Sequence, residues 1–313
     1  MPDRAVPNAA LAHFPRASLP LIEEKTGIKC RRYAADDQCT SDLGFLAARV
    51  CLDRAGVAPE ELDAILLATS TPDRIQPATA TRVQELLGAS RAFAFDVSSV
   101  CSGSVYAIHL ADMLIRSGEA RRVLVVASEL YSRFLDPKDF STRASLGDGA
   151  GAVLLGPAES PQGIVLSRLH SDGSGNHLIQ VPAGGTMMPY NRMKNPRDAY
   201  FLMHGREVYE FATAQGEAVV NELLAACDVN RSDVAFVVPH QANITVLKAL
   251  AARLGIELSK FVINLDRYGN TAAASVLIAL DELMMSGRVQ PGDLVVLVVF
   301  GGGLSWGATL IRI

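Results

Sequence analysis

One supersecondary unit occurs twice in this chain, and that repetition restricts the fold more than any other feature of the sequence. Three pairs of positions in the two halves lie 169 to 171 residues apart: Ile65 and Phe236, Cys101 and Asn270, and Leu124 and Leu294. A nearly constant offset indicates a duplicated unit with internal pseudo-symmetry. We therefore expect two α/β halves, residues 1–160 and 161–313, divided near the Pro/Gly-containing turn at 156–163.

Apolar segments of strand length alternate with segments of helical periodicity in both halves. In the first half we expect strands at 62–71, 92–99, 122–129 and 151–155, and helices at 77–87 and 102–117. The second half repeats this order, with strands at 234–239, 261–265 and 294–300, helices at 244–254 and 271–286, and a closing segment at 307–313. Continuous apolar strands between helices favour parallel pairing with both sheet faces covered.

The bulk composition excludes several classes of function. The net charge of −4 gives no electrostatic case for nucleic-acid binding. No apolar run reaches the length of a membrane span, and the N-terminus lacks the apolar region of a secretory signal. The five cysteines are odd in number and match neither a zinc motif nor a disulfide framework. We expect a cytoplasmic protein with reduced thiols and no bound metal.

Cys101 lies where a predicted strand ends and a predicted helix begins, between small residues that leave room for a substrate. A helix N-terminus carries about half a positive charge, which stabilises a thiolate. We therefore interpret Cys101 as a nucleophile and predict a lowered pKa for its thiol. The alternative is a buried structural cysteine, and this is our interpretation of the other four.

Two further side chains follow strands of the second half. His240 lies after the strand 234–239 and could act as a general base or a hydrogen-bond donor; the alternative is a core histidine with satisfied partners. Asn270 precedes an Ala-rich helix, where asparagine is ordinarily an N-cap. The run Gly301–Gly303 could present backbone N–H groups as an oxyanion hole, or simply form a tight turn.

These segments together resemble the ketoacyl-[acyl-carrier-protein] synthase III family of the thiolase superfamily. The matching segments run over nearly the whole chain in the family's order: EKTGIKCRRYA (24–34), the Cys101 segment, LGDGAGAVLL (146–155), VPHQAN (238–243), DRYGNTAAAS (266–275) and FGGGLSWGA (300–308). The resemblance implies a thiolase-like fold, in which the two α/β halves form a layered α-β-α-β-α core.

The resemblance also implies an activity and its parts. An acyl group passes from acyl-CoA to Cys101, and decarboxylative Claisen condensation with malonyl-[acyl-carrier protein] gives a 3-oxoacyl product in fatty-acid-type biosynthesis. His240 and Asn270 are the implied decarboxylation donors, and the backbone N–H groups of Cys101 and Gly303 the oxyanion hole. No metal or redox cofactor is implied; the implied partners are acyl-CoA, an acyl carrier protein and a second copy of the chain. The implied substrate-binding positions are Lys25, Thr26, Phe140, Gly205, Asn243 and Phe300.

The positions that correspond to the family's acyl pocket depart from its pattern. They are Arg74, Gln76, Arg143, Leu146 and Met203. Gln76 replaces a bulky apolar residue and Leu146 a phenylalanine, so a specialised member that takes a dicarboxylic, glutaryl-like primer for a pimeloyl or biotin precursor is one alternative. In another, the two arginines form surface or dimer salt bridges. A non-condensing acyltransferase and a catalytically silent subunit are further alternatives on this fold.

The family usually opens with a strand of the type I-x-G-x-G-x-Y-L-P, and the segment 1–6 corresponds to the residues just after it. Because that strand lies inside the family's sheet, we expect a sheet edge without its partner here. The sequence leaves open whether a misassigned start codon, a truncation or a neighbouring segment accounts for this.

Overall fold

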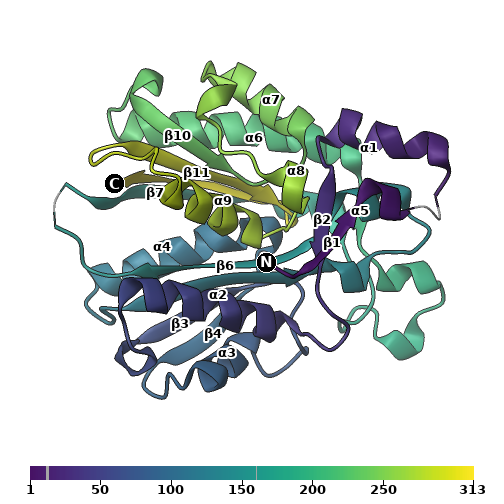
Figure 1. The fold of residues 1–313 in the computed structure, drawn as a ribbon, viewed down its shortest axis with the longest axis horizontal. Helices are drawn as coiled ribbons and strands as arrows, with labels where there is room; N and C mark the ends of the chain where they lie inside the picture. Colours follow the sequence, from purple (N-terminus) through teal and green to yellow (C-terminus); the bar gives the residue numbers. More distant parts are fainter. Residues whose placement is uncertain (12–13, 160) are drawn as a thin grey trace.

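Two stacked sheets form the centre of the molecule, as the computed structural model shows for residues 1–11, 14–159 and 161–313 (Figure 1). The strand order is β4-β3-β5-β6 in the first sheet and β10-β11-β12-β7 in the second. The bounds of these strands are β3 (Ala64–Ala68), β4 (Phe93–Val97), β5 (Val123–Leu130), β6 (Asp148–Leu155), β7 (Gly163–Ser171), β10 (Val234–Pro239), β11 (Leu294–Gly301) and β12 (Ser305–Arg312).

Helices fill the space between the sheets and cover both outer faces. The middle layer consists of α4 (Gly103–Arg116) and α9 (Ala274–Met285). The first sheet is covered by α2 (Thr40–Ala55) and α3 (Thr79–Leu87), and the second by α6 (Gly205–Ala226) and α7 (Ile244–Leu254). This arrangement is the layered α-β-α-β-α core of a thiolase-like fold, so the predicted fold class is confirmed.

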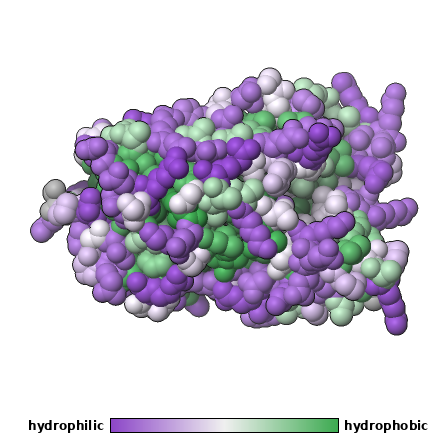
Figure 2. Space-filling view, turned by 90° about the horizontal axis from the view of Figure 1, so that it is seen from above, coloured by the Kyte–Doolittle hydropathy of each residue, from purple (hydrophilic) through white to green (hydrophobic). Residues whose placement is uncertain are grey.

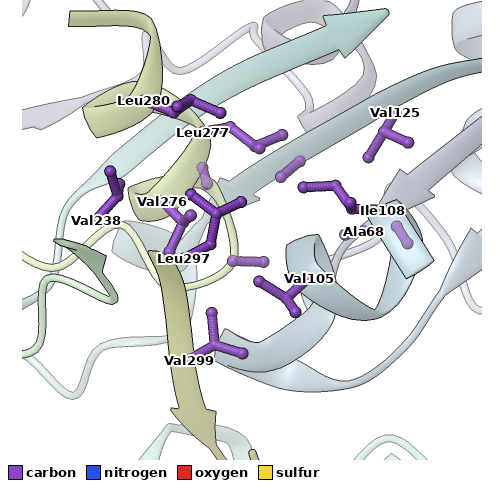
Figure 3. Packing of buried hydrophobic residues seen from close by; sticks show 14 of the residues in the cluster. Ala68, Val105, Ile108, Val125, Val238, Val276, Leu277, Leu280, Leu297 and Val299 are labelled. Atoms are coloured by element: carbon purple, nitrogen blue, oxygen red, sulfur yellow. The ribbon is translucent and has the colours of Figure 1, made fainter. Parts of the chain in front are cut away.

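The middle layer is apolar because both of its faces are covered. Figure 3 shows Val105 and Ile108 of α4 packing in one cluster with Val276 and Leu277 of α9 and with Leu297 of β11. Helix α9 is rich in Ala and Leu, which favour helix, and it buries eight of its twelve residues. This buried layer carries the turns that precede α4 and α9, where the candidate site lies.

Strand pairing is mixed rather than parallel throughout. The pairs β3–β4, β3–β5 and β10–β11 are parallel, whereas β5–β6, β11–β12 and β12–β7 are antiparallel. The prediction of parallel pairing was therefore wrong for the last strands of each half. A connection as short as the one between Gly301 and Ser305 can join only antiparallel neighbours.

The predicted strand 261–265 was also wrong. Only Phe261 bridges to Val237, and the chain then enters the short helix α8 (Leu265–Tyr268). The backbone N–H of Asn264 donates to Oε1 of the buried Gln241, so a side chain replaces the strand partner at that point.

Several elements escaped the sequence prediction: α1 (Leu19–Thr26), α5 (Phe140–Ser145), β1 (Arg4–Pro7), β2 (Cys30–Tyr33), β8 (Ile179–Gln180) and β9 (Leu202–Met203), together with α2, α6 and β7. The division of the chain at residue 160 stays a prediction, and Ser160 itself lies outside the described residues. The strands of the first sheet precede it and those of the second follow it. Within the described part of the chain, no helix is long and apolar enough to cross a bilayer.

Strand β6 has a free edge. It pairs with β5 on one side only, whereas its counterpart β12 lies between β11 and β7. Among the described strands, β6 therefore has one side without a partner. Apolar side chains also reach the surface elsewhere, and the face seen from above shows hydrophobic patches among mostly hydrophilic residues (Figure 2).

Candidate active site

Cys101 is held in a strained turn at the start of α4. It lies in the 3₁₀ turn Val100–Ser102 and is 8% exposed. The preceding Val100 has φ 44°, a left-handed value that costs a β-branched residue energy. A Cβ on Gly301 would lie 2.9 Å from the Cys101 backbone nitrogen, so the glycine run packs directly against the cysteine.

The Cys101 thiol is protonated in this environment. Burial raises its pKa, and the Glu129 carboxylate raises it further, while the backbone N–H of Cys101 lowers it. The predicted lowering by the helix N-terminus is therefore outweighed, because the side chain lies inside the apolar cluster rather than at an open helix end. The thiol therefore ionises only when another group accepts its proton or when a bound substrate stabilises the thiolate.

His240 follows β10 and is 2% exposed. Its Nδ1 lies 2.8 Å from the Ser275 hydroxyl, and its ring meets the Phe300 ring at 5.5 Å, edge to face. Burial lowers the pKa of His240 to about 4, although a backbone hydrogen bond at Ala272 raises it. The ring is therefore neutral near pH 7. If the Ser275 hydroxyl donates to Nδ1, the ring proton lies on Nε2.

Backbone hydrogen bonds between two loops hold Asn270 in place. Its backbone N–H donates to Ser145 and its carbonyl accepts from Gly147. Its side-chain Oδ1 accepts from the Ala272 N–H at 2.9 Å, so Nδ2 is left as the donor end of the amide. Gly147 must be glycine here, because a Cβ would lie 2.6 Å from the Tyr268 carbonyl oxygen.

Ala272 is linked by hydrogen bonds to two of these residues. Its backbone forms a hydrogen bond with the His240 side chain and donates to Oδ1 of Asn270, and Ala272 belongs to the same buried apolar cluster as Cys101. It also has a left-handed φ of 46°, like Val100 before Cys101. The strained turns at the amino ends of α4 and α9 lie against each other, because a Cβ on Gly103 would lie 3.6 Å from the Cβ of Ala273.

The glycine run closes the site on the β11 side. Gly301 and Gly302 are buried against Cys101 and Val100, and Gly303 is exposed with φ 134°, a value that only glycine adopts readily. The peptide bond between Gly303 and Leu304 is cis. Because Gly303 is exposed, it stands at the open end of this turn.

Sequence reasoning missed two buried charged residues near the site. Arg31 is fully buried and donates to the carbonyls of Val6 and Ala144 and to the Asn8 side chain. A Cβ added to Gly147 or to Gly269 would lie 3.1 Å from the Cβ of Arg31. Arg31 therefore lies beneath the loops that hold Asn270. The sequence gives no signal for this role, because an arginine beside another arginine is typical of a surface.

Glu129 is the second such residue, at the end of β5. Its carboxylate accepts from Thr69, Ser70 and Thr71, and Ser70 also contacts the Tyr131 hydroxyl at 2.8 Å. Burial raises the pKa of Glu129 to about 7, against the lowering effect of these donors. It therefore changes charge close to neutral pH and affects the Cys101 thiol.

The implied substrate-binding positions divide into surface and structural ones. Lys25 and Gly205 are exposed, Phe140 packs on Phe14 with ring centroids 5.0 Å apart, and Phe300 lies against His240. Thr26 donates to Ile22 within its own helix. Asn243 is the N-cap of α7, its side chain accepting from Val246.

The predicted acyl-pocket residues differ in their burial. Leu146 is buried and bridges to Asn270. Arg74 and Gln76 lie in an exposed loop, and Met203 is 43% exposed. Arg143 is half-buried, with its Nε left without a partner among the described residues.

Comparison with known proteins decides the family. The sequence model described as 3-oxoacyl-[acyl-carrier-protein (ACP)] synthase III matches residues 95–173, and that of its C-terminal part matches residues 224–313. A β-ketoacyl-[acyl-carrier-protein] synthase III of Erythrobacter litoralis is 44% identical over 316 residues, covering 100% of this chain and 96% of the relative. The chain belongs to the ketoacyl-[acyl-carrier-protein] synthase III family.

Further relatives and solved structures support the same family assignment. The synthase III of Rhodospirillum centenum is also 44% identical over 100% of this chain and 96% of its own length. The crystal structure of 3-oxoacyl-[acyl-carrier-protein] synthase III from Aquifex aeolicus has a TM-score of 0.92 at 39% identity, covering 100% of this chain and 97% of that one. That from Thermus thermophilus has a TM-score of 0.92 at 37% identity, covering 100% and 96%. This chain is therefore an acyltransferase-type condensing enzyme of the synthase III family.

Proposed function

We propose that this enzyme transfers an acyl group from acyl-CoA to Cys101 and condenses it with malonyl-[acyl-carrier protein], releasing CO₂ and a 3-oxoacyl-[acyl-carrier protein]. The observation that carries the proposal is a chain of contacts: Gly301 packs against Cys101, the neighbouring Phe300 packs against His240, and Ala272 is hydrogen-bonded to both His240 and Asn270. A nucleophile and two N–H donors are the groups that this two-step chemistry requires.

In the first step the Cys101 thiol loses its proton and its sulfur attacks the thioester carbonyl. The backbone N–H groups of Cys101 and Gly303 are the proposed donors to the oxyanion. Collapse of this intermediate breaks the bond to the CoA sulfur, which takes up a proton as it leaves. Because burial raises the thiol pKa, proton removal is a substantial part of the barrier to this step.

In the second step the bond between the malonyl carboxylate and its methylene carbon breaks. CO₂ leaves, and the electron pair becomes an enolate on the thioester. The Nε2–H of His240 and the Nδ2–H of Asn270 are the proposed donors to that enolate oxygen. The carbanion then attacks the acyl carbonyl, and the Cys101 thiolate leaves. Neutral His240 suits this role, since a donor is needed rather than a charge.

Every step uses only the thiol, the imidazole, the amide and the backbone, so we propose that no metal or redox cofactor takes part. The substrates are carried by CoA and by the pantetheine arm of the carrier protein. We place their path near Lys25, Phe140 and Asn243, which lie on neighbouring elements α1, α5 and α7. We propose a cytoplasmic location, in keeping with five cysteines that are all free.

The relatives favour this function over the alternatives. The curated relatives at 42–44% identity carry the name β-ketoacyl-[acyl-carrier-protein] synthase III. Arg74 and Gln76 are exposed in the loop after β3, and no contact among the described residues gives a dicarboxylic primer support. Retention of Asn270 with a free amide donor argues against a non-condensing acyltransferase.

We also propose a two-fold dimer through the edge of β4. Phe93 and Phe95 are 46% and 38% exposed on this edge strand, and their rings stack 6.3 Å apart. Ile75, in the loop after β3, is 82% exposed. An exposed apolar edge strand promotes aggregation unless it is paired or covered. An isologous two-fold contact would cover the β4 edge of both protomers at once. Sedimentation of Phe95→Lys should show a monomer; a dimer as tight as that of the unmodified chain would contradict this interface.

Release of CO₂ from malonyl-[acyl-carrier protein] tests the proposed function. The unmodified enzyme should release CO₂ in step with 3-oxoacyl product. Asn270→Ala should lose this release by roughly 100-fold, typical for loss of one oxyanion donor, while Cys101 still becomes acylated. Acyl transfer to an alcohol or amine without CO₂ would overturn the proposal in favour of a non-condensing enzyme.

A further inference from the structure

Cys101 lies beyond the carboxyl ends of three neighbouring parallel strands, β4, β3 and β5. Ala68, the last residue of β3, lies opposite Val97 at the end of β4 and opposite Ala127 of β5. A Cβ on Gly103 would lie 3.1 Å from the Cβ of Ala68, so the turn that holds Cys101 packs on the end of β3. The residues that follow β3 and those at the end of β5 therefore lie at the same end of the sheet as the nucleophile.

Glu129, at this end of β5, is a fully buried carboxylate without a positive partner among the described residues. Its oxygens accept from the hydroxyls of Thr69, Ser70 and Thr71, at 3.4, 2.9 and 2.6 Å, and from the Ser70 backbone N–H at 3.2 Å. None of the ion pairs in the part of the chain that the structure describes includes Glu129. A buried carboxylate that is held by neutral donors takes up a proton readily.

One of these donors extends the hydrogen bonding from Glu129 to Tyr131. The Oγ of Ser70 lies 2.8 Å from the Oη of Tyr131 and 2.9 Å from Oε1 of Glu129. Because the Ser70 hydroxyl has a single hydrogen, which it donates to Glu129, the phenol of Tyr131 donates to Ser70. Tyr131 is 3% exposed, packs edge to face on Phe201, and belongs to the same buried cluster as Cys101. A series of hydrogen bonds thus runs from the cluster of the nucleophile to the buried carboxylate.

The charges at the two ends of this series are coupled. Burial, and then the Glu129 carboxylate, raises the pKa of the Cys101 thiol. Burial and the charges of Glu129 and of a Cys101 thiolate raise the pKa of Tyr131. A thiolate beside ionised Glu129 would place two negative charges in one buried site, whereas transfer of the thiol proton to Glu129 leaves only one.

We propose that Glu129 accepts the proton of the Cys101 thiol during acylation and returns it to the CoA sulfur as CoA leaves. The proton moves along the hydrogen bonds of Ser70 and Tyr131, and we call these three side chains, Tyr131, Ser70 and Glu129, the relay. This role deepens the proposed function and rests on it. Ser70 and Glu129 act on the thiol through Tyr131 and do not touch the acyl group.

Each proton in the relay has a donor and an acceptor. As the sulfur attacks the thioester carbonyl, its proton passes to Oη of Tyr131, the phenol proton to Oγ of Ser70, and the Ser70 proton to Glu129. When the bond between the acyl carbon and the CoA sulfur breaks, the transfers run in reverse and the phenol protonates the CoA sulfur. The relay then has the same protons as before, and Cys101 carries the acyl group.

The pH dependence of acylation tests the role of Glu129. In the unmodified enzyme the acylation rate, measured by intact mass after short incubation with acyl-CoA, should rise as Glu129 ionises and level off above about pH 7. Above that pH the thiol and the carboxylate share one proton, so their combined protonation no longer changes. In Glu129→Gln the rate at pH 7 should fall roughly 100-fold and should then keep rising with pH, because the thiol proton must go to solvent. A fall by the same factor at every pH would indicate a structural role and overturn the proposal.

Alkylation separates the relay from the charge of Glu129. Iodide leaves without taking up a proton, so the reaction of Cys101 with iodoacetamide reports the thiolate alone. Glu129→Gln removes a negative charge near the thiol, so it should not slow alkylation at pH 7, whereas it should slow acylation. Equal losses in the two reactions would show that the variant only disturbs the nucleophile, which overturns the relay.

Tyr131→Phe breaks the relay while keeping the ring and leaving Glu129 with all its donors. It should slow acylation at pH 7 roughly 100-fold. Tyr33→Phe is the matched control, because Tyr33 is 7% exposed and lies in the same buried cluster, but its hydroxyl lies 3.5 Å from the carbonyl oxygen of Arg143 and not in the relay. This control should acylate like the unmodified enzyme. Equal rates in the two tyrosine variants would contradict the relay.

Variants of Ser70 test the middle of the relay. Ser70→Ala should slow acylation as Tyr131→Phe does, because no hydroxyl then joins the phenol to the carboxylate. Ser70→Thr keeps the hydroxyl and should restore most of the rate. If Ser70→Ala and Ser70→Thr acylate equally, the hydroxyl carries no proton and the proposal is wrong.

These measurements distinguish failure of the relay from failure of the proposed function. If the unmodified enzyme does not acylate Cys101, both proposals are overturned. If it does, and Glu129→Gln, Tyr131→Phe and Ser70→Ala match it at every pH, the proposed function stands and the relay is overturned.

Discussion

Gly301→Ala should damage the active site through a single methyl group. A Cβ at this position would lie 2.9 Å from the Cys101 nitrogen, 3.0 Å from its Cβ and 3.2 Å from the Ser102 nitrogen. Two of these atoms belong to the backbone and cannot rotate away. Ordinary contact begins near 3.4 Å, so the nucleophile must move by roughly half an ångström.

The effect on catalysis follows from that displacement. A misplacement of about 1 Å can cost 100-fold in rate, so we expect acylation of Cys101 to fall roughly ten- to 100-fold. Overpacking a buried contact should destabilise the fold by about 1–3 kcal/mol. Acylation is measured by intact mass after timed incubation with acyl-CoA, and stability by urea unfolding.

Gly185→Ala is the matched control, because a Cβ there meets nothing within 4 Å and its φ is not left-handed. It should acylate and unfold like the unmodified enzyme. If Gly301→Ala behaved in the same way as this control, the packing of the glycine run against Cys101 would not position the nucleophile.

Two further predictions concern the buried charges. Because burial and Glu129 raise the pKa of the Cys101 thiol, the rate of its alkylation by iodoacetamide should keep rising with pH up to about 9. Glu129→Gln should increase this rate several-fold above pH 7. Well below pH 7 it should leave the rate unchanged, because Glu129 is itself protonated there. An increase of the same size at pH 5.5 would contradict the electrostatic explanation. Arg31→Lys should lower the free energy of unfolding by about 2–3 kcal/mol, because the fork of Arg31 holds three acceptors that one ammonium cannot reach together. It should also reduce CO₂ release more than Cys101 acylation, since Arg31 lies beneath the loops that hold Asn270; equal losses in both assays would indicate a general effect on the fold.

Periodicity and duplication predicted much of the central core. The strand 234–239 and the helix 244–254 were predicted with the bounds that the structure shows, because an apolar strand and a capped, Gly-terminated helix are strong local signals. The strand 261–265 was wrong because its partner is a glutamine side chain, a contact between residues 23 apart that no periodicity records. Antiparallel pairing of β6 and β12 likewise depends on connection geometry rather than on composition.

The sequence named the candidate site residues but not their electrostatics. Cys101, His240 and Asn270 were named from positions after strands and from the family resemblance; Ala272 is hydrogen-bonded to the last two, and the catalytic roles of all three stay predictions. The raised pKa of the thiol was not foreseen, because burial depends on the surrounding cluster rather than on the local helix end. Glu129 and Arg31 were missed for the same reason: their partners come from distant segments.

Mass spectrometry of the chain after incubation with acyl-CoA, followed by peptide mapping, is the most direct test of the central claim. The account predicts one added acyl group, located on Cys101, which disappears when malonyl-[acyl-carrier protein] is added and never forms in Cys101→Ala. An acyl group on another residue, or equal labelling of Cys101→Ala, would contradict the assignment of Cys101 as the nucleophile.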